Sequence, residues 1–443
     1  MARQLFGTDG VRGRAGHFLT AELAVALARA AVAHQPQPRP QVLIVRDTRE
    51  SGEMLEAAIA AGVTSAGGDA LLGGVLPTPA APLLVRRHGL HLAAVISASH
   101  NPYEDNGIKL FAADGFKLSD SREHEIENEL QKPVAPPEAI GRVRRLDGAL
   151  EDYLDALHTR FGALDLGGRR ILLDCAHGAT YRAAPEIFRR LGAEVEVKAD
   201  QPDGRNINDG CGSTHLEDIC AAMRAGDHDA GFAFDGDGDR VLAVDRTGEV
   251  VDGDELVALA ALHLRRGGRL PGDGVAVTVM TNYGFHNAMA AAGVQVATTA
   301  VGDRYVLDEL RRRGWSLGGE QSGHIIELGF GPSGDGIASA LLTLEALAGT
   351  DLADRHAMEK LPQRLVNIRA ADRAALEAAM EDTEVTAAIK QAGATLSGRG
   401  RVLVRASGTE PLIRVMVEAP SAHETEEVCG WLAGVVQATL ASP

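Results

Sequence analysis

Residues 92–102 have the sequence Leu-Ala-Ala-Val-Ile-Ser-Ala-Ser-His-Asn-Pro, an apolar run that ends in a polar, turn-forming loop. Residues 92–96 predict a short buried strand. Pro102 biases Asn101 toward an extended conformation, so the loop does not continue into a helix. We expect Ser99 to display its hydroxyl there. Taken alone, the stretch also fits a strand-ending turn in which Ser99 bonds only the backbone. Partners from other loops decide between the two interpretations.

Strands and helices alternate on both sides of this stretch. Buried-strand patterns at 42–45, 170–174, 230–234 and 274–279 are each followed or preceded by helical patterns or polar loops. Strands that alternate with helices of about 10–15 residues indicate largely parallel α/β layers, with ligand loops at the strand ends. Residues 401–418 instead form two apolar runs joined by a short loop, which favours a hairpin in a C-terminal α+β domain.

Length and composition are typical of a globular protein of several domains. The 443 residues correspond to about three domains, and 45% of them are hydrophobic. The net charge of −17 argues against a nucleic-acid partner. The four cysteines form no Cys-x-x-Cys pair, which suggests free thiols in a reducing compartment. No signal-peptide core and no apolar run of about 18 residues is present, so we expect a cytoplasmic protein without a membrane partner.

Residues 235–240, Asp-Gly-Asp-Gly-Asp-Arg, carry the most informative chemistry. Three carboxylates at alternate positions repel one another unless a cation neutralises them, and oxygen ligands suit Mg²⁺, Mn²⁺ or Ca²⁺. An EF-hand loop that started at Asp235 would need glycine and glutamate where this chain has Arg240 and Arg246. The alternative is a solvated acidic turn between two strands. A metal loop at a strand end explains the pattern better.

Three further loops gather polar groups. Residues 6–13 are rich in glycine and include Arg12, residues 319–324 place Glu320, Ser322 and His324 at alternate positions, and residues 405–414 combine hydroxyls with two arginines. The last set has the parts of a phosphate-binding loop without the order of a P-loop. Each loop also has a structural alternative: an ordered turn for residues 6–13, a packed histidine for residues 319–324, and a tight turn with surface arginines for residues 405–414.

Five motifs, in order along the whole chain, resemble those of the α-D-phosphohexomutase superfamily. They are Gly7-Thr8-Asp9-Gly10-Val11-Arg12-Gly13, Ser97-Ala98-Ser99-His100-Asn101-Pro102, Asp235-Gly236-Asp237-Gly238-Asp239-Arg240, Gly319-Glu320-Gln321-Ser322-Gly323-His324 and Arg405-Ala406-Ser407-Gly408-Thr409-Glu410-Pro411. At three positions, Gln321, Ser97 and Ala406, the residue type resembles that of the phosphoglucosamine mutase branch. Phosphomannomutases and phosphoglucomutases more often have Met, Thr and Pro at those positions.

The resemblance implies four domains around a central cleft, three α/β domains with mixed or parallel sheets and a smaller C-terminal α+β domain. We expect the boundaries 1–155 for the domain with the phosphoserine loop, 156–253 for the metal loop, 254–364 for the sugar loop and 365–443 for the phosphate loop.

The resemblance also assigns roles to residues. It implies that Ser99 is carried as a phosphoserine, and that Mg²⁺ is held by a phosphoserine oxygen together with Asp235, Asp237 and Asp239. Arg12, Lys109 and His324 are expected to stabilise the transferring group or to move the sugar's proton. His100 is not expected to be the base for Ser99, because adjacent side chains on an extended segment diverge. The residues expected to bind substrate are Glu320, Ser322 and His324 for the sugar, Arg405, Ser407, Gly408, Thr409 and Arg414 for the distal phosphate, and Arg240 and Arg304.

The implied activity is that of an isomerase. It would interconvert glucosamine 6-phosphate and glucosamine 1-phosphate through a 1,6-bisphosphate, with Mg²⁺ and glucosamine or glucose 1,6-bisphosphate as cofactors, on the way to the cell-wall precursor UDP-N-acetylglucosamine. A homodimer is left open. The alternatives are a phosphomannomutase or phosphoglucomutase, a metal-dependent sugar-phosphate phosphohydrolase, and a silent sugar-phosphate-binding protein.

Overall fold

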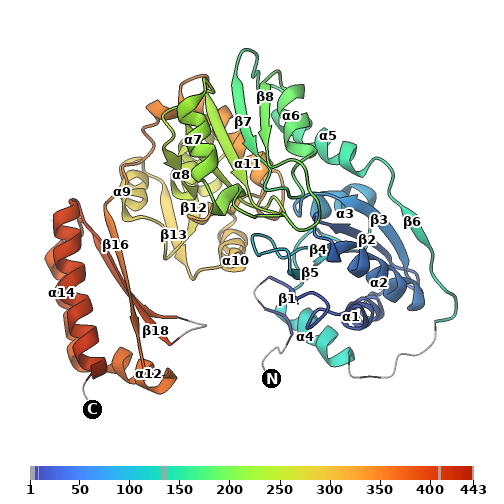
Figure 1. Ribbon diagram of the computed structural model, residues 1–443, viewed down its shortest axis with the longest axis horizontal. Helices are drawn as coiled ribbons and strands as arrows, with labels where there is room; N and C mark the ends of the chain where they lie inside the picture. The colour runs from blue at the N-terminus through green and yellow to red at the C-terminus, as the bar shows by residue number, and fades with distance from the viewer. Residues whose placement is uncertain (1–4, 8, 131, 133–136, 408–410, 442–443) are drawn as a thin grey trace. The chain divides into compact units, whose positions relative to one another are not determined.

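The computed structural model describes residues 5–7, 9–130, 132, 137–407 and 411–441 (Figure 1). The fold divides into two compact units: the first spans residues 1–280 and 294–355, and the second spans residues 281–293 and 356–443. The first unit contains three of the sheets and the second contains the fourth. Each unit is described by itself.

The first sheet has six strands in the order β1-β5-β4-β2-β3-β6. Strands β4, β2, β3 and β6 run parallel, whereas β5 pairs antiparallel with β4 and β1. The elements are β1 (Val11–Arg14), α1 (Ala21–Ala33), β2 (Gln41–Arg46), α2 (Ser51–Ser65), β3 (Asp69–Val75), α3 (Ala80–His88), β4 (Leu92–Ile96), β5 (Asp105–Ala112), α4 (Asp120–Glu129), β6 (Val143–Arg145) and α5 (Ala149–Phe161). All of β4 is buried, as its apolar run predicts.

The second sheet has five strands in the order β11-β10-β9-β7-β8. Its strands β9, β7 and β8 are parallel, and β10 and β11 return antiparallel. The elements are β7 (Arg170–Asp174), α6 (Ala183–Arg190), β8 (Glu194–Lys198), the 3-10 turn η1 (Gly212–Thr214), α7 (Glu217–Ala225), β9 (Ala230–Phe234), β10 (Val241–Asp245) and β11 (Val250–Val251). The turn between β9 and β10 is therefore the acidic loop.

The third sheet has four strands in the order β13-β12-β14-β15, of which only β15 is antiparallel to its neighbour. The elements are α8 (Gly253–Arg266), η2 (Pro271–Asp273), β12 (Gly274–Thr278), β13 (Gln295–Thr299), α10 (Asp303–Arg313), β14 (Leu317–Gly319), β15 (Ile325–Glu327), α11 (Gly336–Leu347) and η3 (Leu352–Asp354). Helix α8 begins with a full capping box of Asp252 and Glu255.

The second unit contains an antiparallel sheet in the order β16-β18-β17. Its elements are α9 (Tyr283–Ala291), β16 (Gln363–Arg369), α12 (Arg373–Glu381), α13 (Thr383–Leu396), β17 (Arg401–Ala406), β18 (Leu412–Glu418) and α14 (Ala422–Ala441). Strands β17 and β18 form the predicted hairpin, and α14 packs on β16 and β18 (Figure 1). The C-terminal part is thus α+β, as expected.

Helix α9 belongs to this second unit although its sequence lies inside the expected third domain. The reason is a buried charge: Glu418 on β18 is fully buried, and it accepts hydrogen bonds from the Tyr283 backbone N–H (3.0 Å) and from Asn282, the N-cap of α9 (3.3 Å). Arg401 on β17 also bonds Glu418 and the carbonyl of Thr281. Sequence periodicity carries no sign of such a contact, and the four domain boundaries stay predictions.

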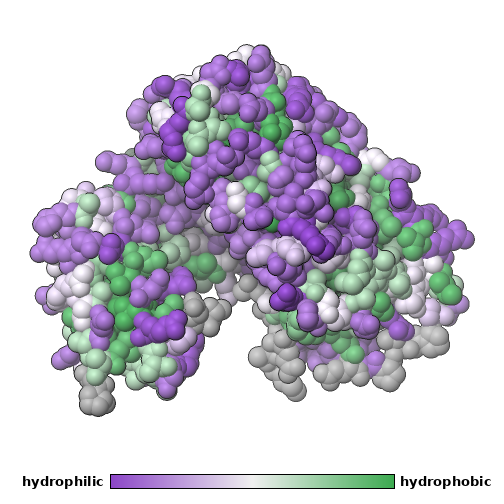
Figure 2. Space-filling model, viewed as in Figure 1, coloured by the Kyte–Doolittle hydropathy of each residue, from purple (hydrophilic) through white to green (hydrophobic). Residues whose placement is uncertain are grey.

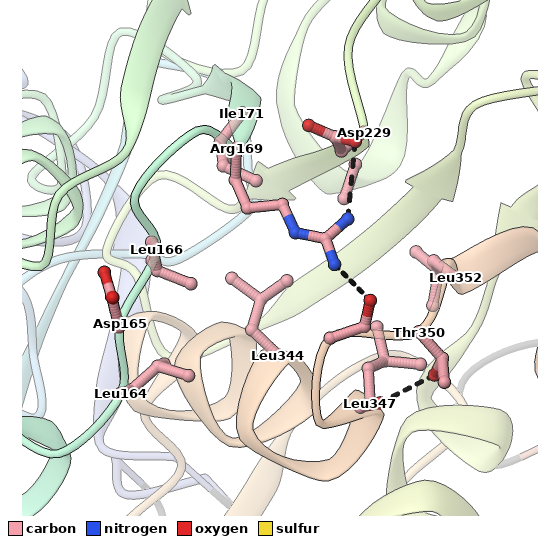
Figure 3. A pocket seen from close by; sticks show the side chains of 12 residues that line it. Leu164, Asp165, Leu166, Arg169, Ile171, Asp229, Leu344, Leu347, Thr350 and Leu352 are labelled. Carbon is pink, nitrogen blue, oxygen red and sulfur yellow. Dashed lines mark hydrogen bonds and ion pairs between the residues drawn. The ribbon is translucent and has the colours of Figure 1, made fainter.

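Polar side chains cover much of the face shown in Figure 2, in keeping with the acidic composition. Away from the loops described below, Arg169 lies beside a small cavity of about 40 Å³ (Figure 3). Its guanidinium bonds Asp229, just before β9, and the carbonyl of Gly349, just after α11. This contact holds the end of α11 against the second sheet.

The sequence-based elements are largely confirmed, with one clear error at the N-terminus. The expected loop at residues 6–13 overlaps a strand, because residues 11–13 belong to β1, which pairs with β5. A four-residue strand with glycine inside gives almost no periodic signal, and its partner strand fixes it instead. Among the described residues, no helix is both long and apolar enough to cross a membrane.

Candidate active site

The serine loop connects β4 to β5 at the end of a buried strand. Ser99 has a left-handed backbone with φ of 56° and is only 1% exposed. Its Oγ donates to Oδ2 of Asp235 across the junction with the second sheet, at 2.6 Å. The hydroxyl is on a loop, as expected, and the acidic loop covers it. The predicted pairing of the serine loop with the acidic loop is present.

His100 lies closer to Ser99 than expected. Nδ1 of His100 is 3.3 Å from the Ser99 Oγ, because the left-handed turn at Ser99 brings the two side chains to one side. The assumption of diverging side chains is wrong. The ring still has little capacity as a base: Arg240 donates to the same nitrogen at 3.2 Å, and burial, followed by the charge of Arg240, lowers the pKa of His100 to about 4.

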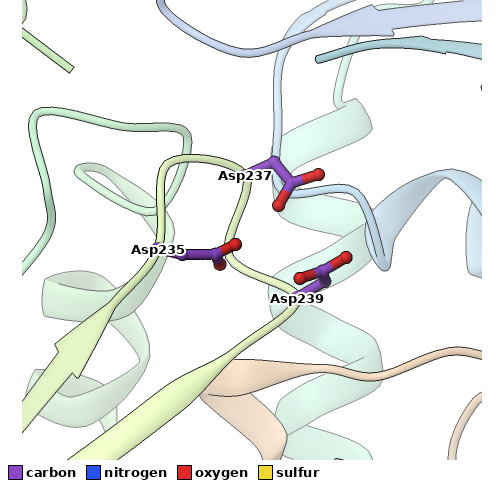
Figure 4. Close-up of side chains that lie close together, drawn as sticks. All are labelled: Asp235, Asp237 and Asp239. Carbon is purple, nitrogen blue, oxygen red and sulfur yellow. The ribbon is translucent and has the colours of Figure 1, made fainter. Parts of the chain in front are cut away.

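The acidic loop presents its three carboxylates to one small space (Figure 4). One oxygen from each of Asp235, Asp237 and Asp239 lies within 4.8 Å of the others, and all three residues are buried. Glycine is required between them. A Cβ on Gly236 would lie 2.7 Å from the carbonyl oxygen of Ser99, and Gly238 has φ of +72°. The two glycines let the acidic loop fold tightly against the serine loop.

The donor set fits a hard divalent cation. Lys109 Nζ contacts Asp237 at 2.8 Å and Asp239 at 3.5 Å, and Thr78 Oγ1 donates to Asp237 at 2.7 Å. Even so, the buried Oδ1 atoms of Asp237 and Asp239 have no hydrogen-bond partner within the part of the chain that the structure describes. Burial, together with the charges of Asp239 and Asp237, raises the pKa of Asp235 well above its usual range. Orphaned carboxylate oxygens in a buried cluster suit Mg²⁺.

A closed ring of alternating charges surrounds these carboxylates. Lys109 also contacts Asp9 at 3.0 Å, Lys117 bonds Asp9 and lies 2.5 Å from Asp303, and the ring of His324 is 3.8 Å from Asp303 and 3.6 Å from Asp239. In order around the ring the residues are Asp239, His324, Asp303, Lys117, Asp9 and Lys109. Lys109 lies on β5 and Asp303 begins α10, whereas the other four are on loops. The ring thus joins segments of all three sheets of the first unit electrostatically.

We expect Lys117→Met to lower the free energy of unfolding by about 3 kcal/mol, because it leaves the largely buried carboxylates of Asp9 and Asp303 without their shared cation. Urea unfolding at neutral pH measures the change. Lys198→Met is the control: Lys198 is a surface lysine paired with the 62% exposed Asp218, and we expect a loss below about 1 kcal/mol. Equal effects of the two substitutions would contradict the buried ring.

The loop between β14 and β15 holds the predicted sugar residues. Glu320 is mostly buried and accepts from the Gly302 backbone N–H at 2.9 Å, whereas Ser322 is exposed. Burial lowers the pKa of His324, but Asp239 and Asp303 outweigh it and raise that pKa to about 9. The Gly334 N–H donates to Nε2 of His324 at 3.1 Å, so the proton of a neutral ring is on Nδ1 and faces Asp239.

The remaining predicted arginines of the first unit have different surroundings. Arg12 on β1 bonds Asp9, and its Nη1 is 3.4 Å from the carbonyl oxygen of Ala98 in the serine loop. Arg240 donates its backbone N–H to Asp235 at 3.1 Å. Arg304, expected to bind substrate, makes ion pairs with Asp120 and Glu123 of α4, and its role toward substrate stays a prediction. The position of Arg304 at the start of α10 explains this contact, and the structure gives its guanidinium a structural partner.

The predicted phosphate loop is in the second unit. Arg405 on β17 and Arg414 on β18 are direct cross-strand partners, and burial, followed by the charge of Arg414, lowers the pKa of Arg405. Two adjacent guanidinium groups of like charge favour a bound anion. Ser407 is buried, and its backbone N–H donates to the carbonyl of Leu412. Gly408 and Thr409 lie outside the described residues.

Several residues at the site were missed by sequence reasoning. They are Asp9, Thr78, Lys117, Asn208 and Asp303. Asp9 stood inside a quoted motif, but nothing marked its carboxylate as a partner of two lysines. Thr78 follows Pro77 in a loop that looked like a simple helix start. Each of these side chains has a partner more than 100 residues away in sequence, and no local pattern records such contacts.

Comparison with known proteins places the whole chain in one family context. Four domains of the phosphoglucomutase/phosphomannomutase family match this chain in order. They are α/β/α domain I at residues 3–135, α/β/α domain II at 151–248, α/β/α domain III at 252–365, and the C-terminal domain at 365–433.

Full-length relatives give the same picture. The phosphoglucosamine mutase of Moorella thermoacetica is 49% identical over 97% of this chain and 98% of its own length, and that of Saccharopolyspora erythraea is 50% identical over 98% and 99%. A phosphoglucomutase/phosphomannomutase family protein from Burkholderia thailandensis has the same fold, with a TM-score of 0.83 at 23% identity over 99% of this chain and 98% of that one. Aspergillus fumigatus N-acetylphosphoglucosamine mutase, solved with GlcNAc-6P and magnesium, matches with a TM-score of 0.68 at 19% identity, over 99% and 96%.

Proposed function

This chain belongs to the phosphoglucomutase/phosphomannomutase family, and we propose that it acts as a phosphoglucosamine mutase, an isomerase that interconverts glucosamine 6-phosphate and glucosamine 1-phosphate. The observation that carries the proposal is the hydrogen bond from the Ser99 hydroxyl to Asp235, the first of three clustered carboxylates. The near-full-length identity to named phosphoglucosamine mutases supports the choice of sugar.

In the proposed reaction, phosphoserine 99 donates its phosphoryl group to a hydroxyl of the sugar. The bond from phosphorus to Ser99 Oγ breaks, the bond from phosphorus to the sugar oxygen forms, and the proton of the sugar hydroxyl leaves for a base. The resulting 1,6-bisphosphate turns over and returns its other phosphate to Ser99. Because phosphoryl transfer depends mainly on positioning and charge neutralisation, cationic groups around Ser99 are the main requirement.

The residues of this chain divide the work. Asp235, Asp237 and Asp239 would hold Mg²⁺, which supplies positive charge to the phosphoryl oxygens. A phosphoserine adds a charge of about −2 beside three carboxylates, so the site needs that cation. Arg12 and Arg240 lie beside the serine loop and would contact the transferring group, while Lys109 and His324 are the groups able to hold or move a proton. Glu320 and Ser322 would bind the sugar hydroxyls or amine.

The distal phosphate site is proposed for Arg405, Arg414 and Ser407, together with Gly408 and Thr409. Arg414→Ala should raise KM for glucosamine 6-phosphate by about tenfold or more and change kcat less, because it removes charge-assisted hydrogen bonds to the non-reacting phosphate. Steady-state kinetics measure both constants. Arg364→Ala on the neighbouring strand, where Arg364 pairs with exposed Glu426, is the control and should leave KM unchanged.

The function itself is tested with purified, phosphorylated protein, Mg²⁺ and a trace of glucose 1,6-bisphosphate. Glucosamine 6-phosphate should be converted to the 1-phosphate with higher kcat/KM than the glucose or mannose phosphates. A preference for glucose or mannose would make the protein a phosphoglucomutase or phosphomannomutase. Release of inorganic phosphate without isomerisation would indicate a phosphohydrolase. The cytoplasmic location, the absence of nucleic-acid and membrane partners, the homodimer and the role in cell-wall precursor synthesis stay predictions.

A further inference from the structure

The loop between β2 and α2 contains a fully buried arginine, Arg49, that the reaction described above does not use. Every N–H of its guanidinium has an acceptor. Nε donates to Asp47 Oδ2 at 2.9 Å, Nη2 donates to the carbonyls of Ser99 (2.9 Å) and Asn101 (2.8 Å), and Nη1 donates to the carbonyls of Pro102 and Asp105 (3.0 Å). All five donors of the side chain are therefore satisfied.

Four of these five acceptors are backbone carbonyls of residues 99–105, the segment that carries Ser99. Carbonyls that converge on one point repel one another and cost free energy when they are buried without donors. A single guanidinium at their centre removes that cost. Because the first of the four belongs to Ser99 itself, the guanidinium constrains the same residue that has the unusual φ of 56°.

Two further contacts fix the amide side of Ser99. The Ser99 N–H donates to Oγ of Ser97 at 2.9 Å, and that hydroxyl donates to Asp47 Oδ2 at 2.6 Å, the oxygen that also accepts from Arg49. On the carbonyl side, the Asn208 side chain, from the segment between β8 and η1, donates to the Ser99 carbonyl at 3.0 Å. The backbone of Ser99 is thus held at both its N–H and its C=O.

We propose that Arg49 is a positioning residue for phosphoryl transfer: it sets the backbone of the Ser99 loop so that Oγ points at the acidic loop. The inference rests on the proposed function, because it assumes that Ser99 carries the phosphoryl group. Because all five donors of Arg49 are bonded within the protein, none is left for a substrate. It acts through the four carbonyls, and its rigid, forked shape matters as much as its charge.

Lysine is the sharpest replacement. Arg49→Lys keeps the positive charge beside Asp47 but has three donors on one nitrogen, so it cannot reach four separated carbonyls and the carboxylate together. A misplacement of about 1 Å at a reacting atom costs on the order of 100-fold in rate. We expect kcat of the Arg49→Lys enzyme, in the phosphorylated form with Mg²⁺, to fall about 100-fold, while KM for glucosamine 6-phosphate changes less than about threefold.

Amide hydrogen exchange gives a readout that does not depend on activity. Exchange should become faster at residues 97–106 in the Arg49→Lys protein and stay unchanged in helix α1 and in the third sheet. Arg355→Lys is the matched control, because Arg355 is also a mostly buried arginine and binds Asp245 and Glu255 far from the serine loop. It should leave both kcat and exchange at residues 97–106 unchanged.

A kcat within twofold of wild type, or an equal rise in exchange across the whole first sheet, would overturn the proposal. If Arg49→Lys does not fold, Ser97→Ala removes one link of the same network. It should lower kcat about tenfold and make amide exchange faster at residues 97–106 alone. No change in kcat or in exchange would also overturn the proposal. Failure of the proposed function is distinguishable. It appears as absent turnover by the wild-type protein, whereas the exchange data still decide whether Arg49 holds the loop.

Discussion

Ser99→Ala should lower kcat for glucosamine 6-phosphate by at least about 10⁴-fold while leaving a folded protein. The substitution removes the only atom of residue 99 that can carry a phosphoryl group. Glucose 1,6-bisphosphate should then no longer transfer phosphate to the protein, which intact-mass analysis shows directly. The loss is expected in kcat because Ser99 is the proposed phosphoryl carrier, whereas the proposed distal phosphate ligands are on other loops.

The free energy of unfolding of the Ser99→Ala protein gives a second test of the contact between Ser99 and Asp235. The Ser99 hydroxyl donates to the buried Asp235, so its removal leaves one carboxylate oxygen without that donor and should cost about 1–3 kcal/mol. The control Ser65→Ala removes a hydroxyl at the end of α2 that donates to the carbonyl of Gly62 in the same helix, and should leave kcat unchanged. More than about 1% residual kcat in the Ser99→Ala protein would show that another group carries the phosphate.

The sequence was sufficient for the order of elements and for the loops that meet, because alternating apolar runs and glycine-rich polar loops leave strong local signals. It located Ser99 and Asp235, whose side chains the structure joins at 2.6 Å. It did not foresee that Ser99 is buried, because burial there comes from the second sheet's acidic loop. It also misplaced His100 relative to Ser99, since the left-handed turn that joins them is stabilised by Arg49, Asn208 and Ser97 together.

Arg304 shows a second limit of prediction from the sequence. A basic residue at the start of a helix beside a glycine-rich loop is as typical of phosphate binding as of an ion pair, and the ion pair depends on the position of α4. In the structure Glu123 on α4 lies 2.9 Å from the guanidinium of Arg304. Long-range charge partners of this kind, like those of Lys117, leave no periodic pattern in the sequence, so they were beyond sequence reasoning.

In the acidic loop, one substitution is expected to change activity and stability in opposite directions. Asp235→Asn should lower kcat by about 10³-fold or more, because it removes one of the three proposed ligands for Mg²⁺. Without metal, the same substitution should stabilise the protein. Burial and two neighbouring carboxylates raise the pKa of Asp235, so its charge opposes folding at pH values above that pKa. The stability gained by the Asp235→Asn protein should therefore be present at neutral pH and shrink as the pH falls and wild-type Asp235 becomes protonated.

Magnesium should reverse the order of the two proteins. A ligand at 100 times its Kd stabilises the folded state by about 2.7 kcal/mol, so Mg²⁺ should raise the unfolding free energy of the wild-type protein by that amount and that of Asp235→Asn far less. Chelation should abolish turnover, and added Mg²⁺ should restore it. Asp174→Asn is the matched control: Asp174 is a buried carboxylate with a raised pKa on the adjacent strand β7, where it accepts from two backbone N–H groups, and its substitution should keep the full response to Mg²⁺. A wild-type protein that Mg²⁺ does not stabilise would contradict a metal at Asp235, Asp237 and Asp239, since three buried carboxylates that bind no cation would have no means of holding a phosphoserine beside them.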